Sequence, residues 1–421
     1  MIKGEKVRLD VHNILYSIYK FNRTLNNPKI LKIINKSKTE DIPFINNVTL
    51  NSMRLQFHTL KIIQKYIKKK LRINEKILLI SAITQIVYLG FKEYAVINCT
   101  VEIAKRLKIY HGLINSVLKR ISADKNKLKK TNIKFDDLPN WFVKKTSYFT
   151  KLEQNKFINN FHLEPDIHVV FKNVKKLNNF EKKIIKTSDV SGFLEDKYDI
   201  KNINSFVEGD WWVQDFSSFF PLNNLNIQNN YKSFLDACAA PGGKAFQILS
   251  TNNKILLNDK NLFRTKTLKK NLKRLKFNSK IVNQDFTKFK NAEKFDFIIL
   301  DAPCTAVGTI RKNPEIFFKS EAPDFDYLSS IQEKMLDKAS LLLNNNGLIL
   351  YMVCSFLEYE TKEQIDKFLY KNTNFKLDDF KLIKNSKYSE LVKNNLMITL
   401  PDKVLEKNID GYFAAYLKKI R

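Results

Sequence analysis

The stretch SFLDACAAPGGK, residues 233–244, runs from apolar residues through a pair of glycines to a lysine. The apolar part predicts a buried strand, and the glycines predict a tight turn into a helix that opens at Lys244. Glycine lets the backbone approach a ligand closely, and the first turn of a helix offers unpaired N–H groups. An ordinary strand-to-helix turn explains the two glycines equally well. Because the spacing matches neither GxGxxG nor a Walker loop, NAD and nucleoside triphosphates are disfavoured as ligands.

Four more strand candidates follow this stretch. Residues 261–276, NLFRTKTLKKNLKRLK, predict a basic amphipathic helix between the second and third strands. Strands that alternate with helices favour a doubly wound, mostly parallel sheet, in which ligands bind beyond the carboxyl ends of the strands. The four candidates are KILLND (254–259), KIVNQD (280–285), FDFIILDAPC (295–304) and GLILYMVCS (347–355).

Three strand candidates are followed or closed by an aspartate: Asp259, Asp285 and Asp301. An acid after the second strand can bind two ribose hydroxyls, one after the third can accept from an adenine amino group, and one after the fourth can face an α-ammonium. A single aspartate at a strand end is more often a helix cap or a solvated turn residue. Together with the glycine turn, the three fit an adenosyl amino acid, so S-adenosylmethionine is the expected cofactor.

Two of the four cysteines follow neighbouring strands, Cys304 the fourth and Cys354 the fifth. Ends of adjacent parallel strands lie roughly 5 Å apart, so both thiols can face one pocket. A cysteine in an apolar setting is usually an inert small hydrophobe, and Cys99 in the helical half is interpreted that way. Since no CxxC pair or Cys/His cluster with zinc spacing occurs, no metal is expected and the thiols should stay reduced.

Methylation at carbon 5 of a pyrimidine would give these thiols a chemical role. That carbon is a poor nucleophile until a thiolate adds to carbon 6 and makes carbon 5 enamine-like. Carbon 5 then takes a methyl group from the sulfonium cofactor, loses its proton, and the thiol is eliminated. An acid such as Asp301 near ring N3 would stabilise the addition by protonating that nitrogen.

The N-terminal part of the chain has a helical pattern. Residues 77–89, ILLISAITQIVYL, are apolar nearly all round and predict a buried central helix, with Gly90 as its C-terminal stop. One face of an earlier helix is predicted by the i, i+3, i+4, i+7 spacing of Val11, Ile14, Leu15 and Ile18.

Three domains are expected from these patterns. Residues 1–145 should form an all-α bundle, and residues 146–230 a small α+β connector around the strand candidate IHVVF (167–171). Residues 231–421 should form the α/β catalytic domain.

The net charge of the chain points to a polyanionic partner. Its 73 basic and 43 acidic residues give a formal charge of +30, and surplus positive charge is useful when phosphates must be neutralised. A general drift toward lysine accounts for part of that excess. No segment approaches the roughly 18 unbroken apolar residues of a membrane span, and the N-terminus lacks the apolar stretch of a signal peptide. A cytoplasmic protein that binds nucleic acid, with no membrane association, is therefore expected.

Four motifs stand in a recognisable order and spacing: CAAPGGK (238–244), LDAPCTAVGTIRKNPEI (300–316), VCS (353–355) and DGYFAAYLKK (410–419). With these motifs the chain resembles the Sun/RsmB-type RNA cytosine-5 methyltransferases over nearly its whole length. Two stretches of the helical half, GLINSVLKRI (112–121) and the preceding residues 77–105, resemble the NusB-like domain of the small-subunit rRNA enzymes in this family.

The resemblance implies a fold, a reaction and a set of site residues. The fold is a Rossmann-like methyltransferase domain with a seven-stranded, mostly parallel sheet, and the product is 5-methylcytosine in small-subunit (16S) rRNA. Cys354 takes the place of the nucleophile, and Cys304 that of the cysteine that assists release. GDWWVQDFSS (209–218) suggests Gln214 and Asp215 for the substrate side. The implied cofactor contacts are Cys238, Ala239, Ala240, Pro241, Gly242, Gly243, Lys244, Asp259, Asp285 and Asp301. The enzyme is expected to be a monomer. Its expected partner is the rRNA of the small ribosomal subunit before that subunit is fully assembled.

Two local features depart from the family or lie outside its chemistry. PCTAVG (303–308) stands where the family usually has Pro-Cys-Ser-Gly-x-Gly, so Ala306 is expected to stiffen that loop. The acids after Cys354, Glu358 and Glu360, are interpreted as first-turn residues of a helix, favoured there by its dipole and without a chemical role.

Two other functions stay open. A DNA cytosine-5 methyltransferase would use Cys304 as the attacking thiol. A non-enzymatic RNA-binding assembly factor would grip phosphate and do no chemistry, although loss of function would be expected to erode the acids and thiols that are present here.

Overall fold

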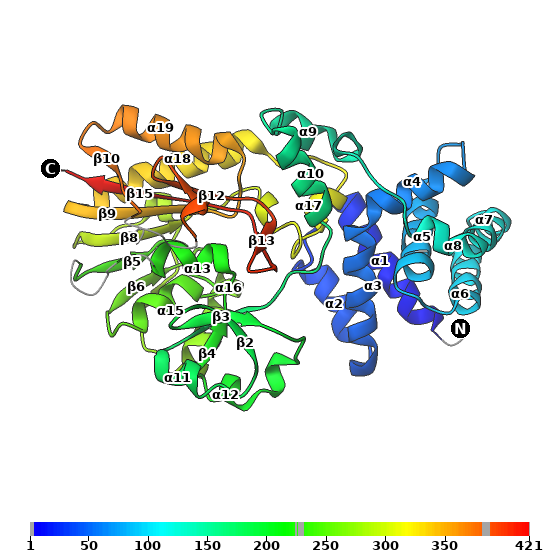
Figure 1. Cartoon of the computed structure of the whole chain (residues 1–421), viewed down its shortest axis with the longest axis horizontal. Helices are drawn as coiled ribbons and strands as arrows, with labels where there is room; N and C mark the ends of the chain where they lie inside the picture. The colour runs from blue at the N-terminus through cyan, green and yellow to red at the C-terminus, as the bar shows by residue number, and fades with distance from the viewer. Residues whose placement is uncertain (1–3, 224, 226–230, 381–387, 421) are drawn as a thin grey trace. The chain divides into compact units, whose positions relative to one another are not determined.

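The computed structural model describes residues 4–223, 225, 231–380 and 388–420. The chain divides into two compact units (Figure 1). The helical unit consists of Met1–Leu163 with Ile310–Pro323, and the sheet unit of Glu164–Thr309 with Asp324–Arg421. No helix in the described ranges is long and apolar enough to cross a membrane.

The helical unit is built on amphipathic helices around one apolar core. The predicted face of the first helix is buried, since Val11 and Leu15 are completely inaccessible. The apolar segment at 77–89 is also buried, as α5 and the π-helical turn η2, and Gly90 follows with a φ of 68°. The helices are α1 (Glu5–Phe21), α2 (Pro28–Lys36), η1 (Thr39–Asp41), α3 (Ile42–Arg54), α4 (Gln56–Tyr66), α5 (Ile73–Ile83), η2 (Thr84–Tyr88), α6 (Glu93–Arg106), α7 (His111–Ala123), α8 (Lys125–Leu128), η3 (Phe135–Asp137), α9 (Asn140–Lys145), α10 (Lys151–Asn160) and α17 (Glu315–Phe318).

Residues 310–323, which the sequence patterns assigned to the catalytic domain, pack into the helical unit instead. The Arg54 guanidinium donates two hydrogen bonds, of 3.0 and 2.8 Å, to the Arg311 carbonyl oxygen. The ring of Phe317 lies 4.8 Å from that of Phe142. The boundaries of the two compact units therefore differ from those expected. The division into three domains, 1–145, 146–230 and 231–421, stays a prediction.

The sheet unit begins with a small antiparallel sheet, in the order β2-β3-β1-β4. The strand candidate at 167–171 is β1, and it pairs with β3 on one side and β4 on the other. This confirms strand structure in the expected α+β connector. Its elements are β1 (His168–Phe171), α11 (Val174–Asn178), β2 (Ile184–Ser188), β3 (Ser191–Leu194), η4 (Ile200–Asn202), α12 (Asn204–Val207), β4 (Trp211–Val213) and α13 (Phe216–Asn223).

The main sheet is mixed, with strand order β11-β12-β15-β9-β8-β5-β6-β7 and β10 also paired with β15. β7, β6, β5, β8 and β9 are parallel, and β15 returns antiparallel to β9. The strands are β5 (Phe234–Asp236), β6 (Ile255–Asn258), β7 (Ile281–Val282), β8 (Phe295–Asp301), β9 (Leu343–Val353), β10 (Phe375–Asp378), β11 (Val392–Lys393), β12 (Leu396–Thr399) and β15 (Tyr412–Lys419). β13 (Asp402–Val404) and β14 (Lys407–Ile409) form a separate hairpin.

The fold class expected from the sequence is confirmed, but the sheet has nine strands in the described part of the chain where seven were expected. The difference arises at one edge, because β12 pairs with the first half of β15 while β10 pairs with the second half. The short hairpin of β11 and β12 therefore extends the sheet without changing its order at the parallel strands.

Helices cover both faces of this sheet (Figure 1). Along β9, Leu350 and Met352 pack in the apolar cluster that contains α15 and α16, whereas Tyr351 and Val353 pack in the one that contains α18 and α19. This period of two explains the continuous apolar run, since a parallel strand buried on both faces needs no polar side. The remaining elements are α15 (Gly243–Leu249), α16 (Leu262–Arg274), η5 (Phe286–Lys288), η6 (Val307–Thr309), α18 (Phe325–Leu342), η7 (Glu358–Glu360), α19 (Lys362–Lys371) and η8 (Ser389–Leu391).

Candidate active site

A cleft of about 240 Å³ lies beyond the carboxyl ends of the parallel strands, within the sheet unit. It brings together most of the polar residues that the sequence placed at strand ends. Those predicted residues in its lining are Cys238, Asp259, Asp285, Asp301, Cys304 and Cys354. Residues 239–244 do not line the cleft in the described structure, although they are part of the predicted cofactor turn.

The glycine turn has a conformation that only glycine adopts without strain. Gly242 has a φ of 120°, and a Cβ there would lie 2.0 Å from the ring of Phe246. The turn is fastened to the next strand by Asp259, which is 4% exposed and accepts hydrogen bonds from the backbone N–H groups of Ala240 (3.2 Å) and Asn261 (2.8 Å). Asp259 therefore shapes the turn from its position at the end of β6.

Asp285 is the exposed acid of the series. It caps η5 by accepting from the backbone N–H of Thr287 at 3.0 Å and from its hydroxyl at 2.8 Å. The hydrogen bond from the Thr287 side chain is the main cause of a lowered pKa at Asp285. The cap explains the local position of this carboxylate, which still lines the cleft.

Asp236 is a buried acid near the cleft that the sequence patterns did not predict. It ends β5, is buried, and accepts a hydrogen bond from the backbone N–H of Cys238 at 3.3 Å. Burial is the main cause that raises its pKa to about 7. The available signal was its position, because Asp236 ends β5 in the quoted stretch just as Asp301 ends β8.

A lysine and a tyrosine hold Asp301 in place. The Lys244 ammonium lies 2.7 Å from Asp301 Oδ2 and donates to the Tyr412 hydroxyl oxygen at 3.1 Å. The Tyr412 hydroxyl in turn donates to Asp301 Oδ1 at 3.0 Å. Burial is the main cause that raises the pKa of Tyr412 well above its ordinary value, so the phenol keeps the proton it donates. Tyr412, from the late DGYFAAYLKK motif, had no predicted role in the site.

The two predicted thiols meet beside these groups. Cys304 Sγ and Cys354 Sγ lie 3.4 Å apart, because Asp301 and Met352 are register partners in β8 and β9. The pKa of Cys304 is raised well above its ordinary value, first by the contact with Cys354 and next by burial. Cys304 is therefore held in the thiol form.

Four hydrogen-bond donors converge on Glu360, which is fully buried. Its Oε1 accepts from the Thr305 N–H at 2.8 Å and from Gln332 Nε2 at 3.2 Å. Its Oε2 accepts from the hydroxyls of Thr305 at 2.6 Å and Ser355 at 2.5 Å. Thr305 and Ser355 directly follow the two cysteines. The interpretation of Glu360 as a helix-start acid was thus incomplete, since this carboxylate links both thiol-bearing loops.

A glycine contact joins the late motif to the same loops. Gly308 donates its N–H to the Cys354 carbonyl at 3.1 Å, and Gly411 donates to the Gly308 carbonyl at 2.8 Å. A Cβ on Gly308 would lie 1.9 Å from the Gly411 carbonyl oxygen, so the two backbones need glycine to come this close. Ala306 in the same loop has a φ of 59°, a left-handed conformation that glycine adopts with less strain, and the expected stiffening of the loop stays a prediction.

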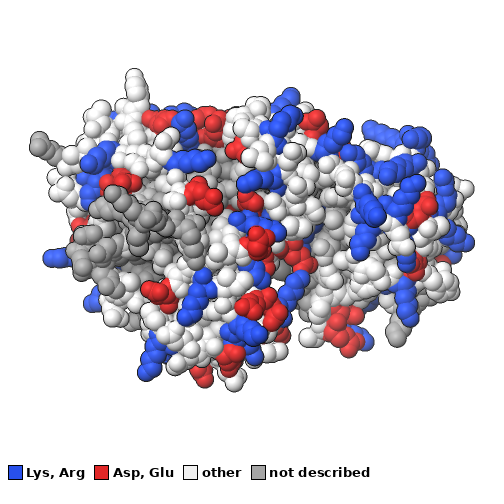
Figure 2. All heavy atoms as spheres, in the orientation of Figure 1, with Lys and Arg blue, Asp and Glu red and all other residues white. Residues whose placement is uncertain are grey.

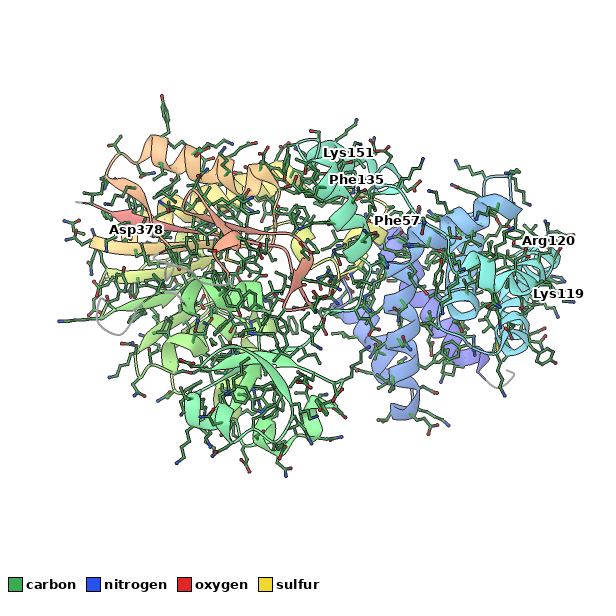
Figure 3. The ribbon with its side chains drawn as sticks, in the orientation of Figure 1. Phe57, Lys119, Arg120, Phe135, Lys151 and Asp378 are labelled. Atoms are coloured by element: carbon green, nitrogen blue, oxygen red, sulfur yellow. The ribbon has the colours of Figure 1, made fainter. Side chains whose placement is uncertain are left out.

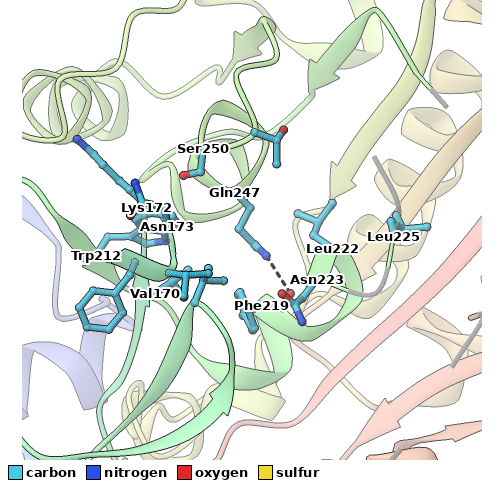
Figure 4. A pocket seen from close by; sticks show the side chains of 14 residues that line it. Val170, Lys172, Asn173, Trp212, Phe219, Leu222, Asn223, Leu225, Gln247 and Ser250 are labelled. Atoms are coloured by element: carbon cyan, nitrogen blue, oxygen red, sulfur yellow. Dashed lines mark hydrogen bonds between the residues drawn. The ribbon is translucent and has the colours of Figure 1, made fainter. Parts of the chain in front are cut away.

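Gln214 and Asp215 do not line the cleft. Gln214 is buried, and its amide donates to Gln247 Oε1 at 2.8 Å. Gln247 lines a different cavity of about 340 Å³, where its own amide donates to the Phe219 carbonyl at 3.1 Å (Figure 4). Asp215 accepts from the backbone N–H of Ser217 at 2.9 Å, at the start of α13. A substrate role for Gln214 and Asp215 stays a prediction.

Comparisons with known proteins agree with this geometry. Residues 222–418 match the family described as 16S rRNA methyltransferase RsmB/F, and residues 5–123 match the NusB family. Ribosomal RNA small subunit methyltransferase B of Shewanella oneidensis is 28% identical over 384 residues, which are 87% of this chain and 87% of the relative.

Solved structures share the fold. PH0851 aligns with 100% of this chain and 99% of its own length, with a TM-score of 0.72 and 20% identity. NSun6 from Pyrococcus horikoshii, in a structure with SFG, covers 67% of this chain and 98% of its own, with a TM-score of 0.56 and 18% identity. The two family matches show an RsmB/F methyltransferase domain at residues 222–418 and a NusB domain at residues 5–123.

Proposed function

We propose that this protein is a SAM-dependent methyltransferase that forms 5-methylcytosine in small-subunit rRNA, with Cys354 as the attacking thiol. The observation that carries the proposal is the 3.4 Å approach of Cys304 and Cys354 in a cleft that also holds the strand-end acids. The family match and the name of the Shewanella oneidensis relative support rRNA as the substrate class.

The residues present fit S-adenosylmethionine. Asp259 and Asp285 follow consecutive strands in one cleft, where carboxylates suit ribose hydroxyls and an adenine amino group. Gly242 keeps the turn before α15 without a side chain, because a Cβ would overlap Phe246. When bound, the cofactor supplies an electrophilic methyl group.

The thiols divide the reaction between them. The Cys354 thiolate adds to carbon 6 of cytosine, which makes carbon 5 nucleophilic toward the methyl group. Carbon 5 then forms a bond to the methyl group as the bond from sulfur to that methyl group breaks. It next loses its proton to solvent, and the bond from Cys354 to carbon 6 breaks to return the thiolate. Cys304 Sγ lies 3.4 Å from Cys354 Sγ, which supports its assignment as the thiol that donates a hydrogen bond to the departing sulfur of Cys354.

Asp301 would orient the base during these steps. Lys244 and Tyr412 fix both oxygens of its carboxylate, so it can meet the N3 edge of cytosine in one orientation. A proton at N3 would stabilise the adduct because it neutralises the negative charge that thiolate addition creates in the ring.

Covalent trapping tests the proposal. RNA that contains 5-fluorocytosine should form a stable adduct with the full-length protein, because fluorine at carbon 5 prevents the proton loss that precedes release. Cys354→Ala should abolish this adduct, and Cys99→Ala serves as the control because Cys99 lies in α6 of the helical unit. Cys304→Ala should still form the adduct and should accumulate it on unmodified RNA, because release is slowed.

Two outcomes would contradict the assignment. An adduct that survives loss of Cys354 but not of Cys304 would make Cys304 the nucleophile, and duplex DNA of the same sequence would then be the substrate to compare. If the wild-type protein binds S-adenosylmethionine but traps no fluorinated RNA, the carbon 5 chemistry is wrong.

A further inference from the structure

The helical unit contains a cavity of about 550 Å³, separate from the cleft of the sheet unit. Its walls come from α4, η2, α10 and the loop after α8, all within Met1–Leu163. Figure 3 marks α4 in this unit by Phe57, the residue before His58. The lining residues used below are His58, Tyr88, Lys129, Thr131, Asn132 and His162.

Four buried polar atoms around this cavity have no hydrogen-bond partner within the described structure. They are His58 Nδ1, Tyr88 Oη, Thr131 Oγ1 and His162 Nδ1. His58 is only 8% exposed, and the centre of its ring lies 4.9 Å from the centre of the His162 ring. Buried polar groups are nearly always paired, so several orphans around one cavity indicate that something polar occupies it.

Both imidazoles are neutral near pH 7. Burial is the main cause that lowers the pKa of His58 to about 4, with further lowering by His162 and Lys61 and a smaller opposing effect of Asp137. Burial is also the main cause that lowers the pKa of His162, against the opposing effect of a hydrogen bond between its ring and the backbone of Ile158. A neutral imidazole donates at one nitrogen and accepts at the other, so these walls suit an uncharged group that carries both donors and acceptors, as a nucleobase does.

A lysine-lined groove of about 420 Å³ adjoins the cavity and shares Thr131 and Asn132 with it. Its lysines are Lys61, Lys65, Lys68 and Lys130. Lys61 is paired with Asp137 at 2.5 Å, while the other three have no acidic partner among the described residues. Figure 2 shows basic side chains gathered over α4 and α7 of this unit, and the groove follows α4.

We propose that the cavity and the groove together bind one unpaired RNA nucleotide, with its base among His58, Tyr88 and His162 and the flanking phosphates on Lys65, Lys68 and Lys130. Single-stranded RNA is recognised in this way elsewhere, by bases splayed into polar and aromatic pockets while cations follow the backbone. This nucleotide would anchor the substrate and undergo no reaction. Its identity as rRNA rests on the proposed function.

The two halves of the pocket make different contributions to binding. Lysines that contact phosphate release counterions, so loss of one such contact should reduce the salt slope of binding to single-stranded RNA by about 0.7. Loss of base contacts should weaken binding about tenfold without a change of slope, because no charge is removed.

Binding of short fluorescein-labelled single-stranded RNA, measured by anisotropy over a range of salt, tests the proposal. All variants are made in the full-length Cys354→Ala protein, so that methyl transfer plays no part. Lys65→Gln should reduce the slope, and His58→Phe should lower the affinity at an unchanged slope. Lys119→Gln, an exposed lysine of α7 outside the groove (Figure 3), is the matched control and should change neither quantity. The corresponding RNA duplex should not respond to His58→Phe.

Thr131→Val provides a second probe of the cavity if His58→Phe lowers the melting temperature, since it removes one orphaned hydroxyl at nearly constant volume. Unchanged affinity in both cavity variants would overturn the proposal and leave water as the occupant. Loss of affinity in Lys65→Gln alone would also overturn it, because the groove would then bind phosphate without a base. Neither result affects trapping by Cys354, so failure here is distinct from failure of the proposed function.

Discussion

Replacing Glu360 with alanine should damage the active site through the loops that carry its thiols. The Thr305 N–H would lose its acceptor, at a cost of about 1–3 kcal/mol for a buried orphaned donor. Gln332 keeps a second acceptor, the Pro303 carbonyl at 2.9 Å, and the Thr305 and Ser355 hydroxyls lie 3.3 Å apart and can pair. With the small cavity left by the side chain, we expect a loss of about 2–4 kcal/mol of folding free energy.

Glutamine at position 360 is the matched comparison. Its amide oxygen can take the place of Oε1 and still accept from the two N–H donors of Thr305 and Gln332. Its NH₂ group can take the place of Oε2 and donate to the hydroxyls of Thr305 and Ser355, which rotate to accept. Burial already raises the pKa of Glu360, so a neutral side chain should cost less than about 1 kcal/mol.

Thermal unfolding and the rate of covalent trapping on fluorinated RNA measure the two effects. Glu360→Ala should lower the melting temperature by roughly 5–15 °C. It should also slow trapping by Cys354 about 100-fold at a temperature where the variant is folded, since small displacements of reacting groups have large effects on rate. Glu360→Gln should trap at close to the wild-type rate. Equal damage from both variants, or wild-type trapping by Glu360→Ala, would refute the positioning role.

Three further predictions concern residues that form hydrogen bonds with the lining of the cleft. The folded-state pKa of Asp236 is raised to about 7, so the folded protein binds this proton more tightly than the unfolded chain, and stability should fall as pH rises from about 4 to 7. In urea unfolding, the free energy of unfolding of Asp236→Asn relative to that of the wild type should rise by up to about 4 kcal/mol between about pH 4 and 7. A difference between the two proteins that does not change with pH would contradict the argument that burial raises the pKa of Asp236. Tyr412→Phe removes a donor to Asp301 but keeps the ring, and methyl-transfer assays should show kcat reduced about tenfold, whereas a wild-type kcat would contradict the role of Tyr412 in holding Asp301. Gly308→Ala would drive a Cβ into the Gly411 carbonyl, so calorimetry should show a loss of about 1–3 kcal/mol or more, whereas an unchanged melting temperature would contradict the close backbone contact.

The parallel sheet and the meeting of its two cysteines follow from local sequence patterns. An apolar run such as 347–353 indicates a strand buried on both faces, and parallel strands carry their ends to one edge. Cys304 and Cys354 could therefore be paired from their positions after the fourth and fifth strands, and the register of β8 with β9 confirms that pairing. Gly90 likewise ended its helix where a residue with positive φ is needed.

Tertiary structure alone decided which polar groups face one another. From its neighbours in sequence, Glu360 is predicted to be an acid at the start of a helix. Its hydrogen-bond partners Thr305 and Gln332 are 55 and 28 residues away along the chain. Asp236 and Tyr412 acquire their shifted pKa values from burial, which no local pattern reports. Residues 310–316 complete a methyltransferase motif in sequence but pack, as part of 310–323, with helices of the other unit. Periodicity records which face of a strand or helix is buried, whereas the partners of a buried polar group depend on loops brought together by long-range packing, and those contacts leave no periodic trace in the sequence.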